Sequence, residues 1–205
     1  MSRGRNIAAI GLMALTFLSG CAKNPFSTRD SEQPYGAAGT WETPQSPDVT
    51  LNNLLYAYNE MVAISNYELC FSDSFSFSSP EDSIDAVNNG RGDLFANWDK
   101  SVEIQTALNI FATFSGADTL GLFLTMAPAS QYTDIVEDTT AVMYRSYTLT
   151  LITTHPLSAD TTVAEWLATF HLRQEQLNWW TITWWGDIPA LPGQTDWGDI
   201  KAEYR

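Results

Sequence analysis

Apolar side chains recur at three- and four-residue spacing after Pro47, and this period predicts an amphipathic helix over residues 47–63. Ser46 can cap the first free backbone amides of this helix, and proline suits its first turn. Asp48 lies near the positive end of the helix dipole. The folded part of the chain therefore begins with a long helix that has one apolar face.

Two more helices are expected before the pattern changes. A short one covers residues 66–71, and Asp99 can cap another in which three apolar side chains share a face, namely Ile104, Leu108 and Phe111. Residues 79–97 contain Pro80 and the turn-forming run Asn88-Asn89-Gly90. This segment is expected to be a loop, with room for a turn of helix.

Strand patterns dominate the second half of the chain. Phe75 and Phe77 alternate with serines, which predicts a half-buried strand over residues 74–78. Beyond Gly116, runs of β-branched and aromatic residues predict four more strands, over residues 119–126, 140–154, 162–174 and 178–187. Because the helices are segregated from a mostly antiparallel sheet, the predicted fold class is α+β.

The N-terminus has the pattern of an export signal. Arg3 and Arg5 form a positive region, and residues 7–18 form an uncharged, mostly apolar segment. Twelve residues are too few to cross a bilayer as a helix, so residues 1–20 are predicted to be a signal peptide and not a membrane anchor.

The signal ends in Leu18-Ser19-Gly20-Cys21, which resembles the lipobox of bacterial lipoproteins. The resemblance implies cleavage before Cys21 and acylation of that cysteine, for example with palmitate, so that the membrane is a partner through the lipid anchor. Ala22 in the next position implies transfer to the outer membrane, facing the periplasm. Several acyl chains make such an anchor durable, since each buried methylene contributes about 0.8 kcal/mol.

The remaining chain divides into a tether and one domain. Residues 21–46 are rich in proline and glycine and show no apolar period, so they are expected to be the lipidated cysteine and a flexible tether. Residues 47–205 are expected to be the folded domain.

The net charge of −14 is opposite to the charge that phosphate binding needs, so no nucleic-acid partner is expected. Cys70 lies among apolar residues and is expected to be a core side chain.

Several stretches of the domain carry a family resemblance. They are Ser46-Pro47-Asp48-Val49, Phe71-Ser72-Asp73-Ser74-Phe75, Trp166 to Leu172, and Trp180 to Asp187. Over residues 46–187 the chain resembles the nuclear transport factor 2-like (NTF2-like) superfamily, which includes SnoaL-like cyclases and ketosteroid isomerases. The resemblance implies a cone, in which a curved sheet wraps around the long N-terminal helix and leaves a pocket at the open end. Many relatives dimerise through the outer sheet face.

Isomerase-like members of this family use a pocket carboxylate as a base with a polar partner. Candidate acids and bases in this chain are Asp73, Glu165, His171 and Asp187. Glu165 and His171 share one face of the strand 162–174, and Trp166 and Phe170 take the other. Either face could line the pocket. The apolar face is preferred, because a buried glutamate needs a partner.

Tryptophan is concentrated in the closing strands. On a regular strand, Trp180 and Trp184 share one face and Trp179 and Trp185 the opposite one, so both faces are aromatic. One face can fill the core, and the other needs a cover, which could be a second copy, an envelope protein or the C-terminal tail around Trp197. The expected ligand or interface residues are Trp166, Phe170, Trp179, Trp180, Trp184 and Trp185.

No cofactor or metal is expected from the motifs. The chain has no Gly-x-Ser-x-Gly elbow and no glycine-rich phosphate loop, its two histidines lack zinc-ligand spacing, and Asp196 and Asp199 are too sparse for a calcium loop. The expected function is therefore non-catalytic binding of a protein partner or an apolar small ligand by a lipid-anchored envelope protein. The alternative is a small SnoaL- or isomerase-like enzyme.

Overall fold

A computed structural model of the chain describes residues 39–115, 120–155, 158–175, 178–189 and 193–205. The signal peptide, Cys21 and most of the expected tether lie outside these residues. The elements follow in the order α2 (Pro47–Glu60), α3 (Ile64–Glu68), β1 (Phe71–Ser78), α4 (Pro80–Asn88), α5 (Lys100–Phe114), β2 (Leu120–Pro128), β3 (Ile135–Val136), β4 (Thr140–His155), β5 (Ser158–Gln174), β6 (Trp180–Pro189) and α6 (Trp197–Tyr204).

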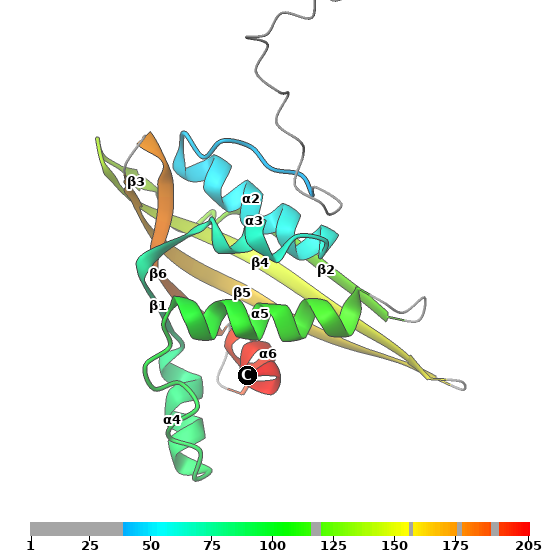
Figure 1. The fold of residues 1–205 in the computed structure, drawn as a ribbon. Coiled ribbons are helices and arrows are strands. Elements are labelled where there is room, and N and C mark those ends of the chain that lie inside the picture. Colours follow the sequence, from blue (N-terminus) through cyan, green and yellow to red (C-terminus); the bar gives the residue numbers. More distant parts are fainter. Residues whose placement is uncertain (1–38, 116–119, 156–157, 176–177, 190–192) are drawn as a thin grey trace, which may run out of the picture. The chain divides into compact units, whose positions relative to one another are not determined.

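One curved sheet organises the domain (Figure 1). Its strand order is β1-β6-β5-β4-β2, with the short β3 paired to β4. All pairs are antiparallel except β1 with β6. The edge strands β1 and β2 are not paired with each other, so the sheet stays open. The predicted α+β class, with a curved and mostly antiparallel sheet wrapped around the first helix, is confirmed.

The first helix is fixed at both ends and along its side. The Ser46 hydroxyl accepts a hydrogen bond from the Val49 amide, as its capping pattern predicts. Farther along, the Asn59 side chain pairs with the backbone of Leu124 in both directions, at 2.8 and 2.9 Å, and so joins α2 to β2. Residues 39–46, which belong to the expected tether, lie against the domain, because the Pro44 carbonyl accepts a hydrogen bond from the Trp180 amide at 2.9 Å.

Aromatic rings fill the space between α2, α5 and the sheet. Tyr58 is fully buried and meets Tyr67, Phe111 and Trp197 edge to face, with ring centroids 5.1–5.5 Å apart. Such pairs add about 0.5–1.5 kcal/mol each beyond the area that they bury. The face of α2 that carries Tyr58 is therefore the centre of the core.

Two helices differ from the expectation. The loop expected over residues 79–97 contains a nine-residue helix, α4, because Pro80 occupies its first turn and does not interrupt it. The C-terminal tail forms α6, which Asp196 and Asp199 begin through a reciprocal capping box. Both helices contribute residues to the cluster of carboxyl groups described below.

Among the described residues, every helix falls short of the length and apolar character that a membrane crossing requires.

The environment of Cys70 yields a testable prediction. The thiol has no exposed surface and contacts the Asn66 carbonyl oxygen at 3.3 Å, and burial raises the pKa of Cys70 well above its usual value. In a Cys21→Ser variant, alkylation of Cys70 by iodoacetamide is expected to be on the order of 100-fold slower in the native protein than in urea, because the thiolate is the nucleophile. Equal rates measured by mass spectrometry would contradict this packing.

Candidate functional site

The structure separates the four candidate acids and bases. Asp73 lies on the surface at β1, where its fully exposed carboxylate pairs with Lys100 at 3.0 Å. Glu165 and His171 are exposed on β5, on the outer face of the sheet. Asp187 is fully buried on β6. These four side chains therefore form no shared acid–base pair.

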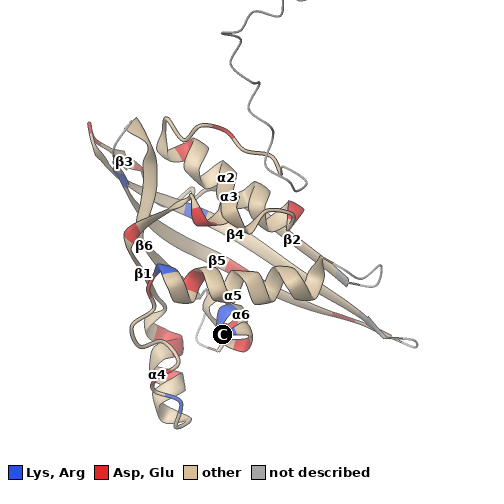
Figure 2. Cartoon of the chain, viewed as in Figure 1, with Lys and Arg blue, Asp and Glu red and all other residues tan. Residues whose placement is uncertain are grey.

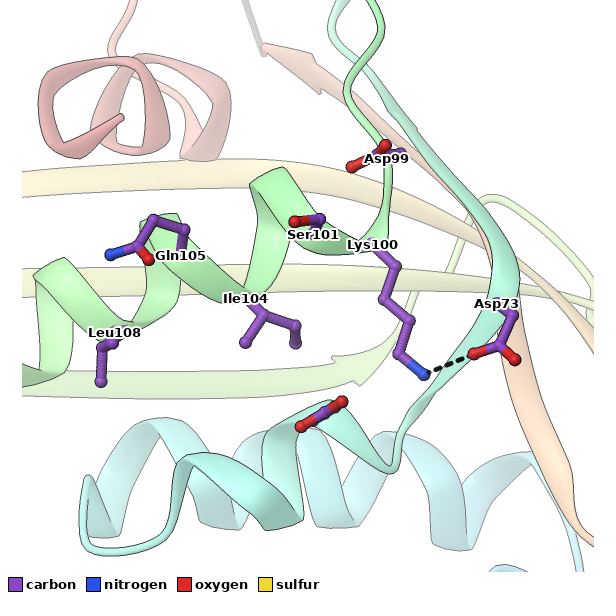
Figure 3. Close-up of a pocket in the computed structure, with 8 residues that line it drawn as sticks. Asp73, Asp99, Lys100, Ser101, Ile104, Gln105 and Leu108 are labelled. Carbon is purple, nitrogen blue, oxygen red and sulfur yellow. Dashed lines mark hydrogen bonds and ion pairs between the residues drawn. The ribbon is translucent and has the colours of Figure 1, made fainter.

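A hollow of about 490 Å³ opens between α3 and α5 (Figure 3). Lys100 points across it towards Asp73, and Ile104 and Leu108 line its apolar side. The ion pair between Lys100 and Asp73 is solvated, so it contributes little energy and supplies no desolvated acid or base. The hollow is therefore an open surface feature with a solvated ion pair at one side.

The inner face of the sheet is occupied by α6, which comes from the chain's own C-terminus. Trp197 has no exposed surface, and its ring lies 4.4 Å from Trp185 and 4.9 Å from Tyr147, centroid to centroid. Its indole Nε1 donates to the Tyr58 hydroxyl at 3.1 Å, and its backbone amide donates to the Tyr147 hydroxyl at 2.9 Å. Trp197 thus fills the space between Tyr58, Tyr147 and Trp185.

A buried ion pair lies behind Trp197. The Lys201 ammonium has no exposed surface and contacts Glu103 of α5 at 2.8 Å. Glu103 also accepts hydrogen bonds from the Tyr67 hydroxyl and from Trp98 Nε1. The ammonium lies 3.3 Å from the ring centroid of Trp185, a distance typical of a cation–π contact. Burial lowers the pKa of Lys201, while Glu103 acts in the opposite direction.

Carboxyl groups gather at the start of α6. Burial raises the pKa of Asp187, and its contacts with Tyr147 and the Gly198 amide oppose that rise. Burial also raises the pKa of Asp196, and the charges of Asp187 and Asp82 raise it further. Asp187 is the one expected acid or base that the structure places in the interior. Asp82 and Asp196 were not expected as site residues, since only the fold brings them together.

The aromatic candidates divide between the core and the surface. Phe170, Trp180 and Trp185 are buried within the domain, so they are not available as interface residues. Trp184 is half-buried on the outer face, where its ring meets His171 with centroids 4.7 Å apart. Partial burial there lowers the pKa of His171. Trp179 is half-buried just before β6.

A β-bulge interrupts the regular alternation of side chains between the two faces of β6. His171 pairs with Trp184, whereas the next residue, Leu172, pairs with Ile182. Thr183 is therefore the extra residue, and it inverts the faces of the residues beyond it. As a result Trp180 and Trp185 both face the core, and Trp184 faces outward, so the shared face expected for Trp180 and Trp184 is wrong.

Trp166 is unusual in both exposure and backbone conformation. It is 44% exposed and has a φ of 147°, which is rare for a bulky residue and costs energy. Its register partners are Tyr147 on β4 and Pro189 on β6, and Asp187 lies opposite Ala168, two residues along β5. Trp166 therefore lies beside the filled interior with much of its ring in solvent.

The fold is similar to that of a conserved protein from Planctomyces limnophilus, with a TM-score of 0.50 and 8% sequence identity over 69% of this chain and 93% of that chain. Similar structures also include a ketosteroid isomerase-like protein from Erwinia carotovora atroseptica (TM-score 0.46, 13% identity, 74% of this chain and 98% of that one). An NTF2-like superfamily protein from Salmonella enterica has a TM-score of 0.44 and 17% identity, over 70% of this chain and 89% of that one.

No protein-family model and no curated protein matches the sequence. At such low identity the structural similarity concerns the fold alone, so the chemistry has to be argued from this chain's own residues.

The filling of the interior predicts unequal effects for two tryptophans. Trp197→Ala should cost about 3–5 kcal/mol of unfolding free energy, because it empties a buried site and removes the hydrogen bond that the indole Nε1 donates to the Tyr58 hydroxyl. Trp184→Ala should cost about 1 kcal/mol, because its ring is half in solvent. Urea unfolding followed by circular dichroism measures both, and equal losses would show that Trp197 does not fill the core.

The buried ion pair predicts a second contrast. Glu103→Gln leaves the Lys201 ammonium buried without a counter-charge and is expected to cost about 3–5 kcal/mol. The matched change Glu165→Gln, on the exposed outer face, should stay within about 0.5 kcal/mol of the parent protein. The same unfolding measurement applies, and a Glu103→Gln loss below about 1 kcal/mol would contradict the pairing.

Proposed function

We propose that this protein is a lipid-anchored, non-catalytic module of the bacterial cell envelope that binds a protein partner through its exterior. The lipobox-like sequence ending at Cys21 supports the anchor, and Ala22 supports an outer-membrane position facing the periplasm. The packing of α6 supports an exterior site, since Trp197 and Lys201 leave the inner face of the sheet occupied. A partner is therefore favoured over an apolar small ligand.

The exposed Trp166 is the observation that carries the binding proposal. Tryptophan is among the residues that most often dominate protein–protein binding energy. A strained backbone persists only where surrounding structure or function maintains it, and such outliers cluster at functional sites. An exposed tryptophan at a φ of 147° satisfies both descriptions. We assign Trp166 as the anchor residue of the contact.

A small SnoaL- or isomerase-like enzyme is the second candidate, and one observation favours it. Asp187 is a buried carboxyl group beside Tyr147, and general acid–base catalysis uses carboxyl groups in desolvated sites next to a hydroxyl. However, α6 covers both side chains, so substrate access would require the helix to leave. For this reason the binding function is preferred.

Membrane attachment is tested by Cys21→Ser. The parent protein should incorporate radiolabelled palmitate and sediment with membranes, and the variant should lose the label and remain unanchored, because the lipid is the proposed attachment. A variant that sediments like the parent protein would contradict the lipid anchor.

Partner binding is tested by photo-crosslinking from the anchored protein in membranes of its host. A photoreactive phenylalanine analogue at Trp166 should give an adduct of discrete mass. The same analogue at Glu165, the adjacent exposed residue on the outer face, should give much less. Equal labelling from both positions, or none from either, would contradict the assignment of Trp166.

A further inference from the structure

Four aspartates converge where α4, β6 and α6 meet. Asp82 comes from α4, Asp187 from β6, and Asp196 and Asp199 from the start of α6. Figure 2 shows acidic residues on both helices. Three of them, Asp82, Asp196 and Asp199, each offer a carboxylate oxygen within 4.8 Å of the other two. The fold thus gathers carboxylates that lie far apart in the sequence.

Close packing holds α4 and α6 together at this point. A side chain at Gly198 would place its Cβ 2.1 Å from Asp82 Oδ2 and 2.9 Å from the Ser79 side chain. Ser79 Oγ in turn donates to Asp82 Oδ2 at 2.5 Å. The first turn of α6 therefore rests directly on Asp82, and the cluster is built into the contact between the two helices.

Buried oxygens without partners provide a second, independent observation. Asp196 has no exposed surface. Its Oδ1 accepts from the Asp199 amide at 3.0 Å, but Oδ2 has no hydrogen-bond partner. Asp187 shows the same division, with Oδ2 bound to the Gly198 amide at 2.8 Å and Oδ1 unpartnered. An orphaned buried carboxylate oxygen is costly, so each one indicates a missing positive or donating group.

The described residues do not supply enough positive charge. Lys201 interacts electrostatically with Asp187 and Asp196, but its ammonium is already paired with Glu103. Arg91 acts on Asp199 and is itself exposed. Several acidic groups, two of them fully buried, are left without a matched positive charge, which is unfavourable unless a cation or protons join them.

We propose that Asp82, Asp196 and Asp199 form a calcium site. The donors are all carboxylate oxygens, which suit a hard cation and not zinc. Calcium bonds to oxygen at about 2.3–2.6 Å, so ligands on opposite sides of the ion lie up to about 5 Å apart. Magnesium requires a smaller, near-octahedral site. The bound ion bridges α4 and α6. The site is independent of the proposed binding function.

The affinity should be modest. The positive end of the α6 dipole faces the same carboxylates and opposes a cation. Backbone amides of α6 also occupy one oxygen each of Asp187 and Asp196. We therefore place the dissociation constant at about 10⁻⁴–10⁻³ M, the range of extracellular calcium modules.

The test uses the full chain, solubilised in detergent and stripped of metal with a chelator. Calcium chloride is titrated by calorimetry, and terbium is titrated by luminescence, with Trp197 as the adjacent light-absorbing ring. Saturable calcium binding is expected, with weaker binding of magnesium. Terbium emission should saturate and should fall when calcium is added. Absence of saturable calcium binding up to about 10 mM, well above the expected constant, would overturn the proposal.

Two charge-neutralising variants localise the site. Asp199→Asn removes the exposed ligand and should weaken calcium binding at least about tenfold, as loss of a charged ligand does. Asp138→Asn removes an exposed charge in the turn between β3 and β4. This control should change the calcium dissociation constant less than about twofold. Circular dichroism checks the fold of each variant, and Asp82→Asn replaces Asp199→Asn if the latter does not fold. Equal weakening of calcium binding in both variants would indicate that the net negative charge attracts calcium diffusely. That result would overturn the proposed site.

Discussion

An ammonium ion with no exposed surface has to be neutralised inside the protein, and this constraint organises the domain. The Glu103 carboxylate neutralises the Lys201 ammonium, and Tyr67 and Trp98 donate hydrogen bonds that hold Glu103 in place. Losing one partner of such a pair costs about 3–5 kcal/mol, so Lys201 and Glu103 have to be placed together. Because Lys201 lies on α6 and Glu103 on α5, the pair fixes the C-terminal helix inside the curved sheet.

The position of α6 determines which surfaces are available for function. Trp197 takes the space beneath Tyr58 and Tyr147, and the inner face of the sheet then serves as core. The proposed contact with a partner is therefore on the exterior, where Trp166 is exposed and has a strained backbone. The start of α6 presents carboxylates to α4, so the same helix that closes the interior also forms the proposed calcium site. Both proposals thus follow from the packed position of α6.

The sequence predicted the elements whose signals are local. The caps Ser46 and Asp99, the period of the first helix and the β-branched runs of the long strands all lie within short windows, and they are present in the structure. Long-range features could not be predicted in this way. The burial of Lys201 depends on a carboxylate from another helix. The bulge at Thr183 reversed the expected faces of Trp180 and Trp184. The capping pair Asp196 and Asp199 was a usable signal for α6, yet its contact with Asp82 requires the fold.

Hydrogen–deuterium exchange of the amides in α6 tests the central claim most directly. If α6 is part of the core, the amides of residues 200–204 should exchange only through global unfolding, with the same free energy as the central strands β4 and β5. If they exchange much faster than β4 and β5 while the sheet stays protected, α6 is a detachable surface helix. That result would contradict a filled interior.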